Sequence, residues 1–318
     1  MADTVLVEST TTIRDSLVNV HGSSDNIAMF MNLFQNETYK NEDVTRVTLP
    51  PIIRSNRKNI VVHGFDPIIQ DVPNPSRIQE WIPICAVLVQ KWGYGFYHFL
   101  NEILPKILRI YEYNNKLPIL IHYNNTFIKS VIEYIGITNP IIQYQPNIVY
   151  PIKNAIIVTE TPSGNPSQSD IALIRKHMRI RDDETISAPV NILIYRKEAR
   201  RNIVNFNDLK SALEARITDA PWVVFESLPF ASCVELFKRA KRIVAPHGAG
   251  LSNMMFAPAG TPIYELFPRN LVNLCYWHLA WILNNPHHSI VCNSTNNSAL
   301  DILVDIDLVC NTIQTTRV

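Results

Sequence analysis

The sequence predicts an α/β protein with two domains, each built on a mostly parallel β-sheet. Short apolar runs rich in Val, Ile and Leu alternate with stretches of helical period along most of the chain, which is typical of parallel strands covered by helices. The 318 residues are enough for two domains of ordinary size, and the hydrophobic fraction of 47% supplies a substantial core. Residues 182–189 are charged and end in a proline, which marks a boundary between domains spanning 1–185 and 186–318. The last residues can pack back on the first domain.

Composition and charge exclude several other classes of protein. A net charge of +1 argues against broad nucleic-acid binding. The five cysteines are widely spaced without a CxxC pair, which indicates reduced thiols rather than a disulfide framework or a zinc site. The N-terminus lacks the pattern of a signal peptide, and no stretch approaches the roughly 18 apolar residues of a membrane span. We therefore expect a soluble, cytoplasmic protein with no transmembrane segment.

The first domain is expected to begin with short strands and loops and then to alternate between strands and helices. Residues 1–80 mix polar segments with short apolar runs, which places them at the flank of this domain. The strands are expected at residues 81–89, 117–122, 141–145 and 154–158, and the helices at 96–114, 125–135 and 170–178.

One pair of polar residues stands out in the helix over residues 96–114. His98 and Glu102 lie four residues apart, so they share one face of the helix. Pro105 is expected to kink the helix one turn after this pair. The pair is either an ordinary surface interaction or part of a functional site, and the pattern alone leaves both interpretations open.

The second domain is expected to continue the alternation. Its strands are expected at residues 191–195, 222–225, 243–245 and 261–266, and its helices at 207–215, 230–240, 251–256 and 272–283. Arg196, Arg200 and Arg201 follow the strand over 191–195. Because the carboxyl ends of parallel strands face the ligand crevice, these arginines form either an anion site or a solvated turn. Their density in a near-neutral chain favours the anion site, since guanidinium groups bind phosphate in a bidentate way.

The stretch over residues 242–267 has the geometry that binds phosphate. An apolar strand leads into the loop Pro246-His247-Gly248-Ala249-Gly250, and a short helix follows. Small residues let backbone N–H groups approach an anion, and the first helical turn supplies unpaired donors and a positive dipole end. His247 in this loop and Glu265 near the end of the next strand are the donor and the carboxylate that a nucleotide's phosphate and ribose require.

These three motifs, in this order, resemble glycosyltransferase family 61, which includes plant core xylosyltransferases and animal N-acetylglucosaminyltransferases. The first motif is His98–Glu102 followed by Leu104 and Pro105, and the second is Arg196, Arg201 and Asn205. The third is His247–Asn253, then Phe256–Gly260, then a strand carrying Glu265. The resemblance covers residues from about 80 to about 310 and leaves the first 80 residues uncovered.

The resemblance implies a GT-B fold, in which two Rossmann-like domains face each other across a cleft. It also implies transfer of a sugar, with inversion, from a UDP-sugar to a hydroxyl of an oligosaccharide or of a glycoprotein glycan. Xylose is the favoured sugar and N-acetylglucosamine the next, and no metal ion is expected. Eukaryotic members typically carry an N-terminal membrane anchor, which this chain does not show, so we expect a soluble microbial or viral version.

The resemblance also gives roles to individual positions. The nucleotide-sugar site is expected to comprise Arg196, Arg201, Asn205, His247, Gly248, Ala249, Gly250, Ser252, Asn253 and Glu265. Among these, the two arginines and the loop over 247–250 would meet the diphosphate without a metal ion, and Glu265 would meet the ribose. Inversion needs one general base, for which Glu102 is the first choice, with His98 orienting it or serving as the base itself.

Two alternatives belong to other functional classes. An NAD(P)-dependent oxidoreductase could use Gly248-x-Gly250, but Asn253 stands where that fingerprint has its third small residue. An inactive nucleotide-binding or sugar-binding module would lose the polar positions, all of which are present here. Asp305 and Asp307 form an Asp-x-Asp sequence that resembles the metal motif of some transferases, but they lie among apolar residues near the end of the chain.

Overall fold

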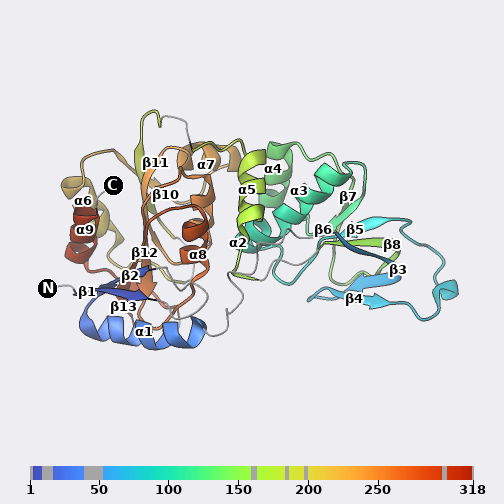
Figure 1. Ribbon diagram of the computed structural model, residues 1–318, viewed down its shortest axis with the longest axis horizontal. Coiled ribbons are helices and arrows are strands. Elements are labelled where there is room, and N and C mark those ends of the chain that lie inside the picture. The colour runs from blue at the N-terminus through green and yellow to red at the C-terminus, as the bar shows by residue number, and fades with distance from the viewer. Residues whose placement is uncertain are drawn as a thin grey trace. The chain divides into compact units, whose positions relative to one another are not determined.

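The chain folds into two compact units, of which the first is discontinuous in sequence. The computed structural model describes residues 3–8, 17–38, 53–158, 163–182, 186–196, 200–295 and 299–316. Unit 1 comprises Met1–Val47 and Ile180–Val318, and unit 2 comprises Thr48–Arg179 (Figure 1). Each unit contains its own sheet with helices packed on it.

Unit 1 is built on an eight-stranded sheet whose central strands are parallel. Along the sheet the order is β1-β2-β13-β12-β11-β9-β10, and β14 pairs with β13. The strands are β1 Asp3–Glu8, β2 Leu17–Gly22, β9 Val190–Ile194, β10 Trp222–Phe225, β11 Ala240–Pro246, β12 Ile263–Pro268, β13 His287–Ser294 and β14 Ile302–Leu303. All neighbours from β2 to β10 run parallel, whereas β1 and β14 are antiparallel to their partners. Every residue of β12 is buried, as expected for a strand covered on both faces.

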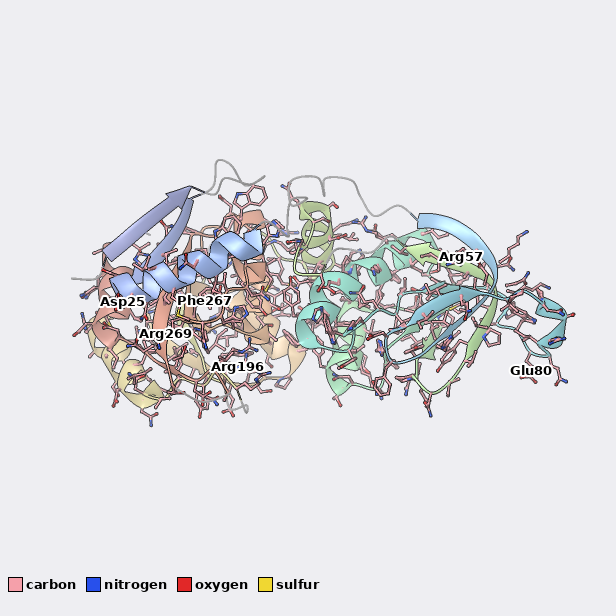
Figure 2. The ribbon with its side chains drawn as sticks, turned by 90° about the horizontal axis from the view of Figure 1, so that it is seen from below. Asp25, Arg57, Glu80, Arg196, Phe267 and Arg269 are labelled. Atoms are coloured by element: carbon pink, nitrogen blue, oxygen red, sulfur yellow. The ribbon has the colours of Figure 1, made fainter. Side chains whose placement is uncertain are left out.

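Helices cover both faces of this sheet. They are α1 Ser24–Thr38, α6 Phe206–Arg216, α7 Phe230–Phe237, α8 Cys275–Ile282, α9 Ile306–Thr315 and the 3₁₀ helix η4 Ala249–Phe256. Leu266 packs in the core beneath α6 and α9, and the next residue, Phe267, packs in the cluster that includes residues of α1 and α8 (Figure 2). Successive strand residues point to opposite faces, so one strand serves both cores.

The chain changes direction within this sheet at β9. The strand that follows β9 in sequence, β10, lies on one side of it, and the next strand, β11, lies on the other side. In doubly wound sheets, such a reversal opens a crevice between the carboxyl ends of the two strands, here those of β9 and β11.

The N-terminal segment differs from its expected place at the flank of the first domain. Strand β2 pairs with β13, and Val20 and Ile27 join the same apolar cluster as Phe267. Unit 1 therefore takes up residues 1–47, although its later boundary, at Ile180, lies close to the expected start at residue 186. A short apolar run does not specify its partner strand, because pairing is decided by the core it completes.

Unit 2 is built on a six-stranded sheet with the order β4-β3-β8-β5-β6-β7. Its strands are β3 Ile53–His63, β4 Ile68–Asp71, β5 Cys85–Val87, β6 Ile119–Ile121, β7 Ile141–Gln143 and β8 Tyr150–Val158. Strands β8, β5, β6 and β7 are parallel, and β3 and β4 add an antiparallel edge. Since β6 lies on one side of β5 and β8 on the other, the reversal in unit 2 falls between β5 and β8.

The long helix expected at residues 96–114 is interrupted by a π-helical turn. It consists of α2 Phe96–His98, the π turn η3 Phe99–Ile103 and α3 Leu104–Tyr113. Pro105 lacks an N–H group and occupies the first turn of α3, where none is needed. The N–H of Leu104 bonds the carbonyl of Phe99, five residues back, so a widened turn occupies the place where a kink was expected.

The remaining helices of unit 2 are α4 Thr126–Ile135, α5 Gln168–His177 and the short η2 Pro75–Arg77. In both units, the helices within the described ranges are too short or too polar to cross a lipid bilayer. All five cysteines are buried and free, as the sequence predicts.

Candidate functional site

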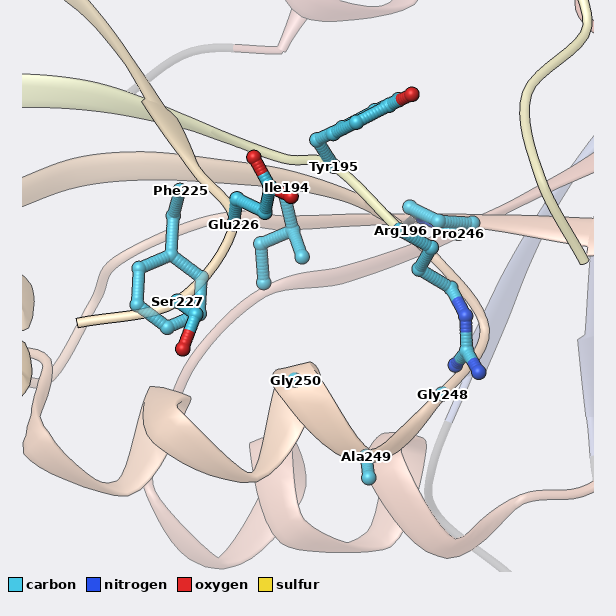
Figure 3. Close-up of a pocket in the computed structure, with 10 residues that line it drawn as sticks. All are labelled: Ile194, Tyr195, Arg196, Phe225, Glu226, Ser227, Pro246, Gly248, Ala249 and Gly250. Atoms are coloured by element: carbon cyan, nitrogen blue, oxygen red, sulfur yellow. The ribbon is translucent and has the colours of Figure 1, made fainter. Parts of the chain in front are cut away.

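A pocket of about 240 Å³ opens at the reversal point of the unit 1 sheet (Figure 3). Its walls come from residues that follow three neighbouring parallel strands, β9, β10 and β11. They are Ile194, Tyr195, Arg196, Phe225, Glu226, Ser227, Pro246, Gly248, Ala249 and Gly250. Four of the residues expected in the nucleotide-sugar site therefore line one cavity, namely Arg196, Gly248, Ala249 and Gly250.

The guanidinium group of Arg196 lies against the backbone of the glycine loop (Figure 3). Its Nη1 atom donates to the carbonyl oxygen of His247 at 3.4 Å. A Cβ atom on Gly248 would come within 1.6 Å of the same Nη1 atom, so only glycine leaves room for this approach. Gly250 packs the start of η4 against Ile194, where an added Cβ would lie 3.2 Å from Cγ2.

The glycine loop and Arg196 together make this end of the pocket positively charged. Helix η4 begins at Ala249, and the first N–H groups of any helix have no acceptor within it. Gly248, Ala249 and Gly250 at the start of this helix line the same pocket as Arg196, which is the arrangement that favours an anion at a helix N-terminus. Burial lowers the pKa of His247, and the positive charges of Arg201 and Arg196 lower it further, so Arg201 also adds charge near this loop.

A buried cluster of one carboxylate and two histidines supports this loop. Nδ1 of His247 lies 2.5 Å from Oε1 of Glu265, and Nε2 of His287 lies 2.8 Å from Oε2. Burial lowers the pKa of His247 to about 3, and it raises the pKa of Glu265 above its ordinary value. The His247 ring also stacks on Phe267, so its position is fixed on two sides.

Glu265 therefore differs from its expected role at the ribose. Its side chain is fully buried, it does not line the pocket, and both of its oxygens bond histidines. Glu265 instead holds the side chain of His247 in place. It thereby supports the loop, in which the carbonyl oxygen of His247 accepts from Arg196. The sequence indicated the right strand end but not the direction in which the carboxylate points.

Three further residues of the expected site act on the backbone instead of lining the pocket. Asn205 bonds both the carbonyl oxygen and the N–H of Val304, at 2.8 and 3.0 Å. Asn253 donates to the carbonyl of Gly250 at 2.9 Å and accepts from Cys233. Ser252 is fully buried and lies close to Tyr276. These residues shape the site and do not reach its cavity.

Sequence reasoning missed the pocket residues that follow β10. Glu226 and Ser227 line the cavity directly after this strand, and Tyr195 follows β9. Their position in the sequence could have revealed these residues, because each of them stands at the carboxyl end of a parallel strand.

A second polar cluster lies at the reversal point of unit 2. Nδ1 of His98 is 3.0 Å from Oε2 of Glu102. Glu102 also accepts hydrogen bonds from the Gln90 side chain and, at 3.3 Å, from the N–H of Gly164. Lys106 donates to Oε1 of Gln90 at 2.6 Å, which orients that amide. The cluster thus joins residues that follow β5 and β8.

The two predicted catalytic residues differ in how much of each side chain is exposed to solvent. Glu102 is 1% exposed, whereas the side chain of His98 is 24% exposed. The pair is therefore not an ordinary surface interaction, and of the two it is His98 that reaches solvent. Gln90 and Gly164 were not predicted, since only folding brings them to Glu102, and neither was Lys106, which bonds Gln90.

Asp305 and Asp307 have roles within helix α9 and its surroundings. Asp305 accepts a hydrogen bond from the N–H of Leu308 and so caps the helix. Asp307 pairs with Arg216 at 2.6 Å. Across the described ranges, no group of three His, Cys, Asp or Glu side chains is arranged so that it could hold a metal ion.

Comparison with known families places the chain among sugar transferases. The family model described as Glycosyltransferase 61 matches residues 96–264. The chain belongs to glycosyltransferase family 61. The match runs from the start of α2 into β12, so it includes His98, Glu102, the arginines and the glycine loop. Membership in this family removes the support for the oxidoreductase alternative.

Individual relatives of this family 61 chain include named N-acetylglucosamine transferases. Protein O-linked-mannose β-1,4-N-acetylglucosaminyltransferase 2 of Danio rerio is 26% identical over 188 residues, which are 57% of this chain and 30% of the relative. EGF domain-specific O-linked N-acetylglucosamine transferase of Drosophila melanogaster is 33% identical over 86 residues, 27% of this chain and 16% of the relative. The match thus spans less than a third of the length of these curated relatives.

A solved structure offers a weaker likeness. The bacterial iron-containing dodecameric glycosyltransferase TibC of enterotoxigenic E. coli aligns with a TM-score of 0.33 and 12% identity, over 61% of each chain. A score of this size does not establish a shared fold, so the family assignment depends on the sequence matches.

Proposed function

We propose that the protein is an inverting glycosyltransferase that moves a sugar from a UDP-sugar to a hydroxyl group of an acceptor glycan. Family membership supports sugar transfer, and the names of the relatives favour N-acetylglucosamine over the xylose that the sequence motifs suggested. The GT-B arrangement implied by the sequence resemblance is part of this proposal.

The observation that carries the proposal is the pocket at the β9–β11 reversal. Arg196, the loop at Gly248 and the first N–H groups of η4 converge there, and Arg201 adds charge. A diphosphate leaving group gains negative charge as the glycosidic bond breaks, and fixed cations and N–H donors stabilise that charge. The arrangement supplies these donors from the chain's own residues.

Glu226 replaces Glu265 as the candidate for recognising the donor's hydroxyl groups. It lines the pocket at the end of β10, whereas Glu265 is enclosed by histidines. A carboxylate at such a strand end accepts hydrogen bonds from a ribose diol.

Proton transfer is assigned to His98, with Glu102 as the residue that positions it. Glu102 accepts from Nδ1 of His98, so the other ring nitrogen, Nε2, is the acceptor that can take the proton of an incoming hydroxyl group. Glu102 was the first choice from sequence, but it is buried and already accepts from Gln90 and Gly164.

The donor assignment can be tested by thermal unfolding in the presence of nucleotides. UDP should raise the melting temperature more than GDP or NADH, because family members mostly use UDP-sugars and bound ligand stabilises the folded state. Transfer should then be measured with UDP-N-acetylglucosamine first and UDP-xylose second. Equal or greater stabilisation by GDP would refute UDP as the donor nucleotide, and stabilisation by NADH alone would favour an oxidoreductase.

A further inference from the structure

Two large aromatic side chains stand exposed in the turn that connects β5 to α2. Trp92 is 50% exposed and Tyr94 is 52% exposed. Exposed apolar surface of this kind has a cost in water, and next to a candidate site it marks a place where a ligand binds. Neither side chain has a part in the chemistry assigned above.

The turn that carries these rings is held in a fixed conformation. The N–H groups of Gly93 and Gly95 bond the carbonyls of Gln90 and Trp92, at 3.1 and 2.7 Å. Trp92 has a φ of 58°, in the left-handed region that favours glycine. Lys91 pairs with Asp66 at 2.9 Å and so ties the turn to the β3–β4 connection. A strained residue that the surroundings hold in place is typical of a functional site.

Trp92 lies beside the proposed catalytic histidine, and Tyr94 lies beside a second histidine. The ring of Trp92 is 5.5 Å from that of His98, measured between centroids. Tyr94 makes an edge contact with His122, the residue that follows β6, at 5.6 Å. Both contacts are at the carboxyl ends of the parallel strands β5 and β6, where doubly wound sheets bind ligands. A molecule packed on Trp92 would therefore lie next to His98.

The chemistry of this surface suits a sugar ring. One face of a pyranose presents C–H groups, which pack against the electron-rich face of an aromatic ring. Its rim of hydroxyl groups needs donors and acceptors, and Lys91 and Asp66 supply both next to Trp92. A nucleotide base could also stack there, but its diphosphate needs an excess of positive charge, and the Lys91–Asp66 pair at this turn is neutral overall.

We propose that Trp92 and Tyr94 form the platform on which a pyranose ring of the acceptor glycan packs, with the reacting hydroxyl turned toward His98. Calling this sugar the acceptor depends on the proposed function. The presence of a sugar-binding platform does not depend on it.

Binding can be tested with sugars alone. Saturation-transfer NMR would use methyl glycosides of mannose, glucose, N-acetylglucosamine and xylose, each with the full chain and no nucleotide. At least one should bind, Trp92→Ala should weaken its binding about tenfold or more, and Trp92→Phe should retain most of it. Tyr113→Ala is the matched control, since Tyr113 is 63% exposed on α3 of the same unit and should have no effect. Equal binding by wild type and Trp92→Ala, or no binding by wild type, would overturn the platform.

Kinetics then separate this proposal from the proposed function. Trp92→Ala and Tyr94→Ala should raise KM for the acceptor about tenfold or more, while the slow hydrolysis of the UDP-sugar by water and the KM for the donor stay unchanged. If the sugar binds through Trp92 but no UDP-sugar is transferred or hydrolysed, the proposed function fails and the platform stands. If transfer occurs and neither substitution changes the acceptor KM, the platform fails and the proposed function stands.

Discussion

At the scale of single residues, the proposed nucleotide pocket depends on the absence of a side chain at Gly248. The Arg196 guanidinium occupies the volume where a Cβ on Gly248 would lie. A long side chain can move away from an added methyl group at little cost to folding. A change at Gly248 should therefore act on ligand binding through the displaced cation, and on stability through its φ of +159°, which side chains rarely adopt.

Gly248→Ala should weaken UDP binding and, because Gly248 has a φ of +159°, it should also lower stability by about 1 kcal/mol. The affinity lost should approach that of Arg196→Ala, about 1.5–3 kcal/mol for hydrogen bonds to a charged group. Gly260→Ala is the matched control, because Gly260 has a φ of +83° and open space around its Cβ position. Its backbone strain should lower stability by about 1 kcal/mol without altering UDP affinity. Calorimetry with UDP and thermal unfolding would be run on all three variants, and unchanged UDP binding by Gly248→Ala would contradict the anion site.

The second residue-scale prediction concerns the division of work between His98 and Glu102. His98→Ala removes the proposed base, so turnover should fall by about 10²-fold or more while UDP affinity is retained. Glu102→Gln keeps the shape of the side chain but no longer fixes His98 as a carboxylate does, so it should lower turnover less and alter the pH profile. The measurement is kcat against pH for each variant. A larger loss for Glu102→Gln than for His98→Ala would return the role of base to Glu102.

At the scale of elements, strand β2 depends on a buried pair of histidines. Nε2 of His21 lies 3.2 Å from Nδ1 of His288 across the β2–β13 pairing. The His288 ring stacks on Tyr264 at 5.0 Å. Burial lowers the pKa of both histidines, to about 4 for His288, and the neighbouring His21 lowers that of His288 further. The contact between His21 and His288 therefore requires both imidazole rings to be neutral.

The free energy of unfolding should consequently fall in mild acid. Below its ordinary pKa of about 6.5 each histidine binds a proton in the unfolded chain, while folded His288 stays neutral down to about pH 4. The unfolded state binds more protons in this window, so stability is present above it and is lost as the pH falls. His288 alone should contribute about 2 kcal/mol between about pH 7 and pH 5.

Urea unfolding of the wild type and of His288→Gln, each at both pH values, measures this contribution. The free energy of unfolding of the variant should differ less between the two pH values than that of the wild type. Its free energy of unfolding at neutral pH accounts for the packing that the substitution itself removes. A variant with the same pH dependence as the wild type would show that this pair does not cause the acid sensitivity.

At the scale of the whole molecule, the same sheet principle appears twice. In unit 1 the reversal at β9 gathers Arg196 and the glycine loop, and in unit 2 the reversal at β5 gathers His98, Glu102 and Gln90. In the proposed function, the first reversal supplies cations for the leaving group, and the second supplies a group that can accept a proton. A transfer reaction requires both capacities, and each unit supplies one.

Transfer activity should survive treatment with EDTA. In the proposed function the positive charge that meets the diphosphate comes from Arg196, Arg201 and the start of η4, and Asp305 and Asp307 are engaged as a helix cap and an ion pair. The assay compares initial rates with EDTA, with EDTA followed by excess Mn²⁺, and without additions. Complete loss in EDTA that Mn²⁺ restores would show that a metal ion takes part in the reaction.

Local pattern was enough to predict much of this protein. The alternation of apolar runs and helical periods predicted parallel strands in both units, and the residue types at strand ends predicted that Arg196 and the glycine loop meet. These features depend on short-range rules, namely that parallel strands share one carboxyl edge and that small residues let a backbone approach an anion.

Long-range packing decided what local pattern could not. Contacts between separate segments of the chain decide the direction of the Glu265 side chain and the bond between Asn205 and Val304. They also bring Gln90 and Gly164 to Glu102. The placement of β2 beside β13 joins residues more than 260 positions apart. The sequence by itself determined many of the strands and helices, though not α1, β13 or α9, and the chemistry available at strand ends. Only the tertiary structure decided which of those groups are enclosed and which reach a ligand, because burial and hydrogen-bond partners come from the whole fold.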